Sequence, residues 1–483
     1  MLEGLEISEQ LLSYVVLDNK SFRFDSTYFI KYSLTLDRNL RQRPHFFLKN
    51  SEVVSGPFGS TLKSHAYLTE GIPFVRVQNI RGGFEIQTDD IIYISEQDNN
   101  ILKNSQLFVD DLVLSKVGNS IGYYSRVDED LQHCNISENN LGIKLAFYPK
   151  NKRHYILSFL NSLYGKVLTL RKVSGNAQPK LNVSDVSEIP IPIQSNNFEE
   201  KISQLILQSR KTKYHSVEIY TAAETLLLQT LGLANFSPST EQVNIKSFKD
   251  SFGTSGRLDA EYYQPKYEQV VAHITAQAHA KLSTLVTIQK SIEPGSDAYT
   301  EDGEEGLPFL RVADYSKLGI TKPQKQLKQS FVDANNKLIE KLIPKANTIL
   351  FSKDGSVGEA YCLRQDADFI TSGAVLHLTI NKSAPVLPDY LTLALNSKLV
   401  KMQSERDAGG SIILHWRVSE IEQVVVPLVD MAIQTQIATL VQQSFTLKAQ
   451  SEHLLEVAKR AVEIAIEQDE QTAMDYIKVQ TGD

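Results

Sequence analysis

Two long stretches of the chain place apolar or small residues at alternating steps of four and three. The first runs from Phe198 to Thr230 and the second from Ile433 to Ala465, and each position of the first recurs 235 residues later in the second. A 3.5-residue period sustained this far predicts a helix that lies in a coiled-coil seam. At about 1.5 Å per residue each helix would reach about 50 Å. Either stretch alone would fit an ordinary amphipathic core helix, but the matched phase favours a helix pair.

The apolar positions of this pattern are the predicted seam residues. They are Phe198, Ile202, Leu205, Ile219, Leu226, Ile433, Ile437, Leu440, Leu447 and Leu454. Serines interrupt both stretches at equivalent places, Ser209 with Ser444 and Ser216 with Ser451. We expect these small side chains to let the two backbones approach while weakening the apolar seam.

The duplication extends well beyond the helices. GIPFVRV, which begins at Gly71, recurs as GLPFLRV from Gly306, and SKVGNSIG from Ser115 recurs as SKDGSVG from Ser352 with one residue fewer. RFDSTYF near the start of the chain likewise matches RLDAEYY at 257–263. The offsets stay between 234 and 237 residues. The chain is therefore predicted to be a tandem duplication of one domain-plus-helix unit.

Each copy shows the same order of hydrophobic patterns. A short helix or turn precedes strand-like segments such as PFVRVQNI (73–80) and PFLRVADY (308–315). One helix-like stretch follows, at 154–168 and 389–403, and then a glycine-containing loop. Alternating apolar residues that end in proline, at 183–193 and 418–428, predict a last strand before the long helix. Each copy is thus a mixed α/β domain of the α+β type, with residues 231–256 as the connector.

Composition limits the class of protein. Cys134 and Cys362 are the only cysteines among 483 residues, which argues against a disulfide framework and fits a reducing compartment. The first ten residues lack the basic and apolar regions of a signal peptide, and no apolar run approaches the roughly 18 residues of a membrane span. We expect a cytoplasmic protein that contacts no membrane.

The net charge of −7 would by itself argue against a nucleic-acid partner, but the charges are segregated. Residues 139–184 contain no acid and eight lysines and arginines, whereas acids gather at 301–305 and 463–471. Any single lysine run is usually solvated surface. Together the runs predict a phosphate-binding face on an otherwise acidic protein.

Motifs of catalysis are missing from the sequence. There is no G-x-G at a strand end, no [DNS]-P-P-[YFW] of adenosylmethionine-dependent amino-methyltransferases, and no P-loop. There is also no H-E-x-x-H metal motif and no nucleophile elbow. We therefore expect no enzyme activity, no metal site and no cofactor in this chain.

The glycine turns at 118–122 and 355–358 and the loops at 173–182 and 406–417 could carry binding chemistry. They are rich in amides, hydroxyls and cations, the groups that contact phosphates and base edges. An ordinary hairpin turn would explain one glycine turn alone. The two loops differ strongly between the copies while their flanks match. A fixed scaffold with divergent tips is typical of two readers of different sequences.

Four features follow one another in the chain: RLDAEYYQPKYE, the GIPF-R-V segment, the Ser-Lys-Gly turn and a proline-ended strand before a long helix. With these features in this order, the chain resembles the specificity subunits of type I restriction–modification systems. The resemblance implies two pseudo-symmetric target-recognition domains, each binding half of a split double-stranded DNA site. Two antiparallel, coiled-coil-like helices would separate these domains and dock two methyltransferase subunits. Those subunits carry S-adenosylmethionine, and restriction subunits can join. The family's Pro-Leu-Pro-Pro-Leu-x-x-Gln is reduced here to IPIP (189–192) and VPL (426–428), with Gln434 kept and Glu199 in the other copy.

The domains implied are target-recognition domain 1 at 1–195, spacer helix 1 at 196–235, the connector with target-recognition domain 2 at 236–430, and spacer helix 2 with the C-terminal tail at 431–483. The predicted DNA contacts of the first copy are Arg76, Gln78, Asn79, Lys116, Asn119, Asn176, Gln178 and Lys180. Those of the second are Arg311, Asp314, Tyr315, Lys353, Ser356, Ser411, His415 and Arg417. Arg76 and Arg311 could instead pair with a carboxylate at a strand end. The seam residues are also the candidates for contact with the partner subunits.

Half-sites one DNA turn apart are separated by roughly 34–36 Å, which helices of about 50 Å can span. The helix pair is therefore predicted to act as a ruler for the spacer of the DNA site. The alternative function is a helical scaffold or adaptor that binds only proteins, which salt-sensitive DNA binding would contradict. An enzyme with its own methyltransferase or nuclease centre is a further alternative, which the missing motifs oppose.

Overall fold

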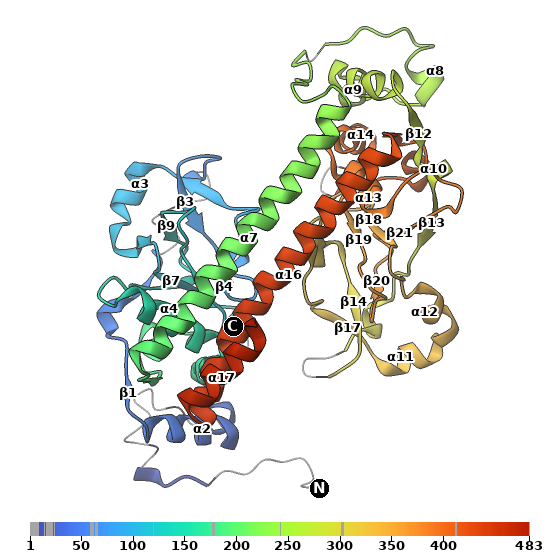
Figure 1. Cartoon of the computed structure of the whole chain (residues 1–483). Coiled ribbons are helices and arrows are strands. Elements are labelled where there is room, and N and C mark those ends of the chain that lie inside the picture. Colours follow the sequence, from blue (N-terminus) through green and yellow to red (C-terminus); the bar gives the residue numbers. More distant parts are fainter. Residues whose placement is uncertain are drawn as a thin grey trace. The chain divides into compact units, whose positions relative to one another are not determined.

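The computed structural model describes residues 9–13, 15, 23, 25–57, 62, 66–118, 120–175, 179–241, 243–300, 304–410 and 413–482 (Figure 1). The chain forms two compact units. Unit 1 consists of Met1–Thr212 and Ala449–Asp483, and unit 2 consists of Lys213–Lys448. Unit 1 is therefore assembled from both ends of the chain. Each unit mixes helices and sheets, as the sequence predicted.

Unit 1 contains a five-stranded sheet, a four-stranded sheet and a two-stranded pair. The strand order of the five-stranded sheet is β2 (Val53–Ser55), β10 (Asn140–Ile143), β7 (Leu112–Ser115), β8 (Tyr124–Arg126) and β4 (Phe84–Glu85). That of the four-stranded sheet is β5 (Ile92–Ile94), β3 (Ile72–Val75), β9 (His133–Ile136) and β6 (Leu107–Phe108). The pair is formed by β1 (His45–Phe46) and β11 (Ile191–Pro192). The helices are η1 (Ser26–Phe29), α2 (Lys31–Arg41), η2 (Asn50–Glu52), η4 (Val77–Asn79), α3 (Glu96–Ile101), η5 (Lys103–Ser105), α4 (Lys150–Asn161), α5 (Leu163–Lys172) and α6 (Val183–Ser187).

Unit 2 repeats this order with sheets of four and three strands and two pairs. The four-stranded sheet has the order β13 (Val286–Lys290), β21 (Val375–Ile380), β18 (Ile349–Ser352) and β19 (Ala360–Cys362). The three-stranded sheet has the order β17 (Lys325–Leu327), β14 (Leu307–Leu310) and β20 (Ile370–Thr371). The pairs are β12 (His279–Lys281) with β22 (Val425–Pro427), and β15 (Tyr315–Ser316) with β16 (Gly319–Ile320). The helices are α8 (Phe252–Ser255), η6 (Ala260–Tyr263), α9 (Pro265–Thr275), α10 (Leu282–Leu285), η7 (Ser296–Ala298), η8 (Val312–Asp314), α11 (Gln329–Ala334), α12 (Asn336–Leu342), α13 (Pro388–Asn396), α14 (Lys398–Asp407) and α15 (Val418–Ile421).

The duplication is visible in individual hydrogen bonds. Asn161 accepts a bond from the backbone N–H of Tyr124 at 3.1 Å and donates to its carbonyl at 2.8 Å. Asn396 holds Ala360 in the same two-bond arrangement, at 3.0 and 2.7 Å. Since these amides tie α4 to β8 and α13 to β19, they place the same helix against the same strand in both units.

The sequence reading was wrong about the first part of each last strand. Residues 183–187 and 418–421 form the short helices α6 and α15, and only Ile191–Pro192 and Val425–Pro427 are strands. A carboxylate caps the start of each helix: Asp185 accepts from the Asn182 N–H at 2.7 Å, and Glu420 accepts from the Arg417 N–H at 3.2 Å. A carboxylate at the third helical position satisfies a free N–H and favours a helix, although the apolar alternation resembles a strand.

The helix-like stretch of each copy is two helices rather than one. α4 ends at Asn161 and α5 begins at Leu163, with Ser162 in an extended conformation between them, and Ser397 separates α13 from α14 in the same way. The Ser162 hydroxyl donates to the Phe159 carbonyl at 2.6 Å and caps α5. Gly165 permits this turn because an added Cβ would lie 2.3 Å from the Phe159 oxygen. The apolar spacing continues through the break, so it gave no sign of it.

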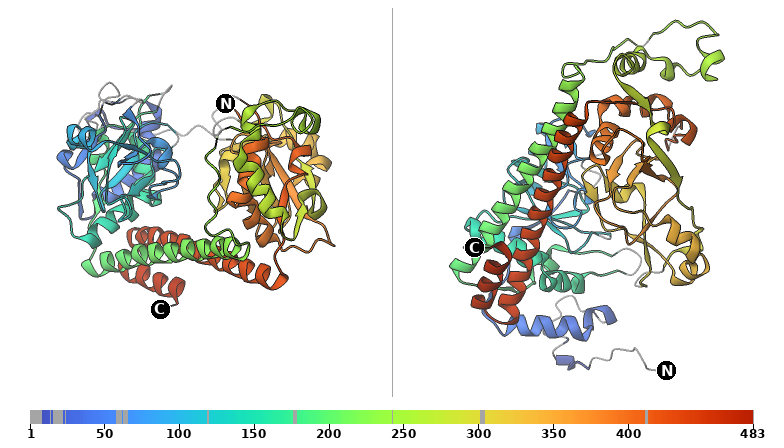
Figure 2. Two further views of the ribbon diagram at one scale, coloured as in Figure 1. Left: turned by 90° about the horizontal axis from the view of Figure 1, so that it is seen from above. Right: turned by 45° about the vertical axis from the view of Figure 1, so that its right-hand side comes forward.

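The two predicted long helices are α7 (Asn196–Thr230) and α16 (Met431–Glu467), which run side by side in Figure 2. In unit 1 the hydroxyls of Ser209 and Ser451 each donate to the other residue's carbonyl at 2.8 Å. In unit 2 Ser216 and Ser444 do the same at 2.8 Å. Seven residues forward along α7 thus correspond to seven residues backward along α16, so the helices are antiparallel.

The core of unit 1 depends on residues from the end of the chain. Ala458 and Ala461 of α16 and Ala473 and Ile477 of α17 (Glu470–Thr481) are fully buried in the same apolar cluster as the β7 and α4 side chains. The carboxylate of Glu470 also accepts a hydrogen bond from the Ser195 N–H at 2.7 Å, just before α7. The residues after the second long helix were expected to form only a C-terminal tail, and α17 was not predicted.

We expect Ile477→Ala to lower the free energy of unfolding of unit 1 by about 2–4 kcal/mol, because a buried isoleucine is replaced by a cavity. Chemical denaturation followed by tyrosine fluorescence would measure the loss. Val479→Ala is the matched control, since Val479 is 78% exposed on the same helix, and it should change stability by less than about 0.5 kcal/mol. Equal effects of both variants would show that α17 does not complete the core.

Candidate nucleic-acid interface

In each unit the structure brings together the glycine turn and the loop before the last short helix, which the sequence singled out separately. In unit 1, Val117 forms a β-bridge with Lys180, and the Leu181 N–H donates to the Lys116 carbonyl at 3.0 Å. In unit 2, Asp354 forms the equivalent bridge with His415. The Trp416 N–H donates to the Lys353 carbonyl at 2.8 Å. In each unit the glycine turn and the loop before the last short helix therefore lie together, and we call the surface that they form the turn-and-loop surface.

Glycine at these turns is required by the backbone. Gly118 and Gly355 have φ values of 78° and 73°, and Gly122 and Gly358 have 94° and 80°. Only glycine adopts this left-handed region without strain. An added Cβ on Gly358 would also come within 3.0 Å of the Ser404 hydroxyl. Both turns thus need glycine at their first and last positions, although unit 2 has one residue fewer between them.

Several predicted DNA-contact residues lie at accessible positions. Gln78, Lys180, Ser356, His415 and Arg417 are exposed, and Lys180 and His415 belong to the turn-and-loop surface. The amide of Gln78 donates to Asp90 at 2.6 Å, and the Nδ1 atom of His415 lies 2.9 Å from Asp354. Their DNA contacts remain predictions.

Four further predicted residues are half-buried and already have partners. Arg76 donates to the main-chain carbonyl of Asp90 at 2.9 Å. Arg311 forms an ion pair with Asp314 at 3.2 Å, which is the carboxylate pairing raised as the alternative. Lys116 donates to the Ser55 hydroxyl at 3.2 Å, and Lys353 pairs with Asp354. Burial, followed by the nearby Lys180, lowers the pKa of Lys116.

Three predicted contacts are contradicted by burial. Asn79 is 0% exposed, accepts from the Arg76 N–H at 2.9 Å and donates to Asp90 at 2.8 Å, so it shapes the η4 turn. Asp314 has the same capping role at η8, accepting from the Arg311 N–H at 2.8 Å. Tyr315 is buried and its hydroxyl donates to the Glu359 carbonyl at 3.2 Å. Asn119, Asn176, Gln178 and Ser411 lie outside the described residues.

The predicted seam residues lie mostly inside the units. Phe198, Ile202 and Ile437 are completely buried, and Leu205 and Ile219 nearly so. Leu226, Ile433, Leu440, Leu447 and Leu454 are partly buried. Their role in the seam is thus consistent with the structure, but the fully buried members cannot contact a partner subunit.

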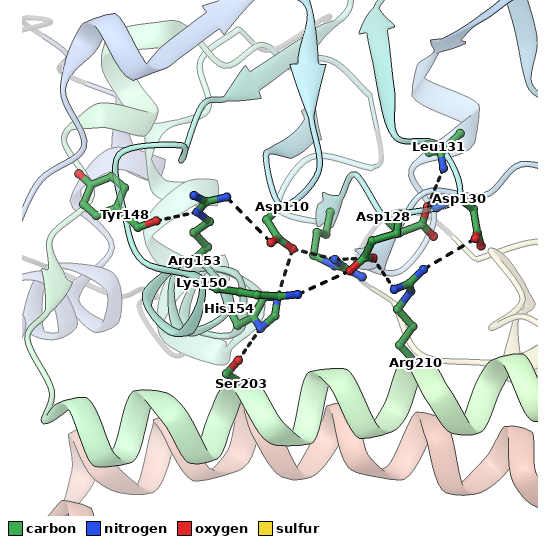
Figure 3. A network of polar contacts seen from close by, with 12 residues as sticks. Asp110, Asp128, Asp130, Leu131, Tyr148, Lys150, Arg153, His154, Ser203 and Arg210 are labelled. Carbon is green, nitrogen blue, oxygen red and sulfur yellow. Dashed lines mark hydrogen bonds and ion pairs between the residues drawn. The ribbon is translucent and has the colours of Figure 1, made fainter.

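A buried polar network joins the recognition fold of unit 1 to α7 (Figure 3). His154 of α4 lies 2.8 Å from the Ser203 hydroxyl on α7 and 3.2 Å from the carboxylate of Asp110. Arg126 pairs with Asp110 at 2.7 Å. Although this resembles a Ser-His-Asp triad, His154 is 0% exposed and Ser203 only 4%, so no substrate reaches them.

Electrostatics support a structural role for this network. Burial raises the pKa of Asp110, but hydrogen bonds and charge from His154 and Arg126 outweigh it and hold the pKa well below its usual range. Burial lowers the pKa of His154, although the hydrogen bond to Asp110 and the charge of Asp110 act in the opposite direction. Arg210 of α7 extends the network to Glu129 at 2.5 Å (Figure 3). The network therefore fixes how α7 packs against the sheet.

Unit 2 makes the equivalent junction with different groups. Asp389, which replaces His154 in the repeat, pairs with Arg364 and accepts from the amide of Gln442 on α16 at 2.8 Å. The Arg364 guanidinium lies over the ring of Phe445, 4.3 Å from its centroid. Phe445 occupies the position of Arg210 in the repeat. The long helix thus contributes the arginine in unit 1, whereas in unit 2 it contributes the aromatic ring and Arg364 comes from outside that helix.

The residues at the two helix starts explain the Gln434 and Glu199 difference. Gln434 accepts from the Leu387 N–H at 3.0 Å and donates to the carbonyls of Pro385 and Val429. Glu199 is equally buried but forms an ion pair with Lys152 at 3.1 Å. Both side chains thus tie the first turn of a long helix to the preceding helix region of their own unit.

Unit 2 contains a cavity of about 310 Å³ lined by Gln289, Asn347, His377 and Pro388. In unit 1 the residue equivalent to Pro388 is Arg153, whose guanidinium donates to the carbonyls of Tyr148 and Ala146 at 2.7 and 3.1 Å. The cavity therefore appears where the repeat has lost a long side chain. Across the described part of the chain, no cluster of three metal-ligating residues is present.

Burial of His377 predicts a pH dependence of unit 2. Burial lowers its pKa to about 4 from 6.5, so between these values the unfolded chain binds a proton that the folded one does not. Stability should therefore fall as the pH is lowered from 6.5 to 4, by about 3 kcal/mol. Denaturation of the wild type and of His377→Gln at several pH values would measure the difference. His279→Gln, at an exposed site of the same unit, is the control, and an unchanged pH dependence in His377→Gln would contradict the assignment.

No helix among the described residues is long and apolar enough to cross a membrane. Residues 280–457, which include nearly all the strands of unit 2 and much of α16, match the family model described as type I restriction modification DNA specificity domain. This part of the chain is therefore similar to that domain, and the resemblance seen in the sequence is confirmed there.

Solved structures of similar proteins include two specificity subunits. The type I restriction-modification system S subunit from M. genitalium is 14% identical, with 86% of this chain and 92% of that chain covered and a TM-score of 0.35. The HsdS subunit from Thermoanaerobacter tengcongensis is 14% identical, with 89% and 96% covered and a TM-score of 0.26. Scores this low do not establish a shared arrangement of the whole chain. No curated protein sequence matches this chain.

Proposed function

We propose that this chain is the non-catalytic DNA-specificity subunit of a type I restriction–modification complex and recognises a bipartite, asymmetric DNA site. The match of residues 280–457 to a DNA specificity domain carries this proposal. Unit 1 supports it because it repeats the strand order, glycine turn and turn-and-loop surface of unit 2. Each unit reads one half-site through its own turn-and-loop surface, which matches the divergence of these loops.

The partners in this proposal are double-stranded DNA and two methyltransferase subunits, which hold the S-adenosylmethionine, while restriction or translocase subunits join through them. The chain itself holds no cofactor and works in the cytoplasm. Because the seam residues are largely buried, we assign docking to apolar side chains that stay exposed on α7. Leu207, Tyr214 and Val217 are 37%, 38% and 48% exposed, at a spacing of seven and three residues. This spacing places them along one helical face.

We expect Leu207→Asp with Val217→Asp to abolish co-purification with the methyltransferase subunit, because two charges would enter an apolar contact. Leu338→Asp is the control, since Leu338 is 46% exposed on α12, away from the long helices in sequence. Size-exclusion chromatography of the co-expressed proteins is the measurement. Assembly that survives the double variant would place docking elsewhere.

The helix pair sets the length of the spacer in this proposal. A second copy of Ile206–Thr212 inserted after Thr212, together with a second copy of Lys448–Leu454 inserted before Lys448, preserves the serine register because the copies pair with each other. Seven residues add about 10.5 Å, or about three base pairs at 3.4 Å each. We expect the preferred spacer to lengthen by about three base pairs while the half-sites stay the same. Insertion into α7 alone is the control, which should break the register and lose assembly.

Mapping of N6-methyladenine in cells that co-express the chain and its methyltransferase tests both the function and the ruler. One split motif that disappears when this chain is deleted establishes the specificity role. Changed half-sites with an unchanged spacer in the double insertion would refute the ruler. Methylation that is unaffected by deletion, with the complex shown to assemble, would favour the alternative of a scaffold that binds only proteins.

A further inference from the structure

The two turn-and-loop surfaces share a backbone but differ in charge. In unit 1 the glycine turn carries Lys116, and Lys180 lies beside it through the bridge to Val117. Lys166 of α5 donates to the Tyr123 hydroxyl at 3.2 Å, on the same turn. The amino group of Lys166 also lies over the Tyr123 ring, 4.4 Å from its centroid. Lysines from three segments therefore border this turn.

These three lysines have no ion-pair partner among the described residues of the chain. The hydrogen-bond partners of Lys116 and Lys166 are hydroxyl groups, which leave the positive charge uncompensated. Glu138 is the acid whose charge reaches Lys116, and its effect on the pKa of Lys116 is smaller than that of burial and of Lys180. Holding like charges together costs free energy that a bound anion would recover.

In unit 2 two acids, Asp354 and Glu359, lie beside the residues that correspond to the three lysines. Asp354 replaces Val117 and pairs with Lys353, the equivalent of Lys116. Asp354 also lies 2.9 Å from the Nδ1 atom of His415, the equivalent of Lys180. Glu359 replaces Tyr123 and pairs with Lys401, the equivalent of Lys166, at 2.8 Å. The positive charges of Lys353 and Lys401 at this turn are thus offset by carboxylates of the same unit.

We propose that the turn of unit 1, with Lys116, Lys166 and Lys180, is a binding site for DNA backbone phosphates, and that the equivalent turn of unit 2 is not. The inference rests on the proposed DNA-binding function and refines it. The contacts of the two turns with the phosphate backbone are therefore asymmetric. Unit 1 supplies salt-dependent affinity at its turn, whereas unit 2 presents a neutral turn there.

The test compares the salt dependence of DNA binding in matched variants of the full chain, using a duplex of mixed sequence. Each lysine that contacts a phosphate contributes about 0.9 to the slope of log K against log salt. Lys116→Met with Lys166→Met and Lys180→Met should reduce the slope by up to about 2.7. The equivalent pair Lys353→Met with Lys401→Met should change it by less than about 0.5, since each charge is already offset by a carboxylate.

A reciprocal exchange of one residue avoids removing any lysine. Val117→Asp should lower the slope by about one, because it installs the acid of unit 2 in unit 1. Asp354→Val should raise the slope by about one, because it frees Lys353. Thermal unfolding of each variant checks the fold, and the lysine variants should not be destabilised since they relieve repulsion.

The outcomes separate this inference from the proposed function. Equal slope changes in the two units, or no change in either exchange, would overturn the asymmetric site while leaving DNA recognition intact. A wild-type chain without salt-dependent DNA binding would overturn the proposed function and the inference with it. If the lysine variants alter stabilisation by inorganic phosphate but not the DNA slope, the site takes a free anion and the proposal fails.

Discussion

Close contact between α7 and α16 is the constraint on which both units depend, and four serines set it. Each hydroxyl reaches the backbone carbonyl of the opposite helix at 2.8 Å, so the two backbones must approach closely. A net hydrogen bond contributes about 1 kcal/mol, whereas a buried leucine contributes about 1.5–3 kcal/mol. Serines therefore stabilise this seam less than leucines would. In exchange, a slipped register would leave buried hydroxyls without partners, so the serines specify one alignment.

Much of the fold was predictable because the chain repeats itself. Matched apolar phase in two copies predicted α7 and α16 nearly to the residue, and the paired glycines predicted the turns. The breaks at Ser162 and Ser397 were not predictable from apolar spacing, because they change the backbone without changing which face is buried. The start of α6 was missed for the opposite reason, since the cap formed by Asn182 and Asp185 overrides an alternating pattern.

The candidate site was predicted less well than the fold. Sequence reasoning chose polar residues by their type and segment. It could not distinguish Asn79, whose amide is hydrogen-bonded inside the protein, from an accessible amide such as Gln78. It also missed Lys166, which reaches the glycine turn from a distant helix. Comparison of the copies position by position would have helped, because Lys166 and Lys401 occupy the same place and face a tyrosine and a glutamate.

The discontinuous core of unit 1 has a consequence for synthesis of the protein. Unit 1 begins first on the ribosome, yet Ala473 and Ile477 complete its apolar cluster only when the last residues have been made. Unit 2 lies between these two parts and is continuous, so it can close while unit 1 still exposes apolar surface. An interruption of translation between Lys448 and Ala473 therefore leaves a complete second unit beside an unfinished first one.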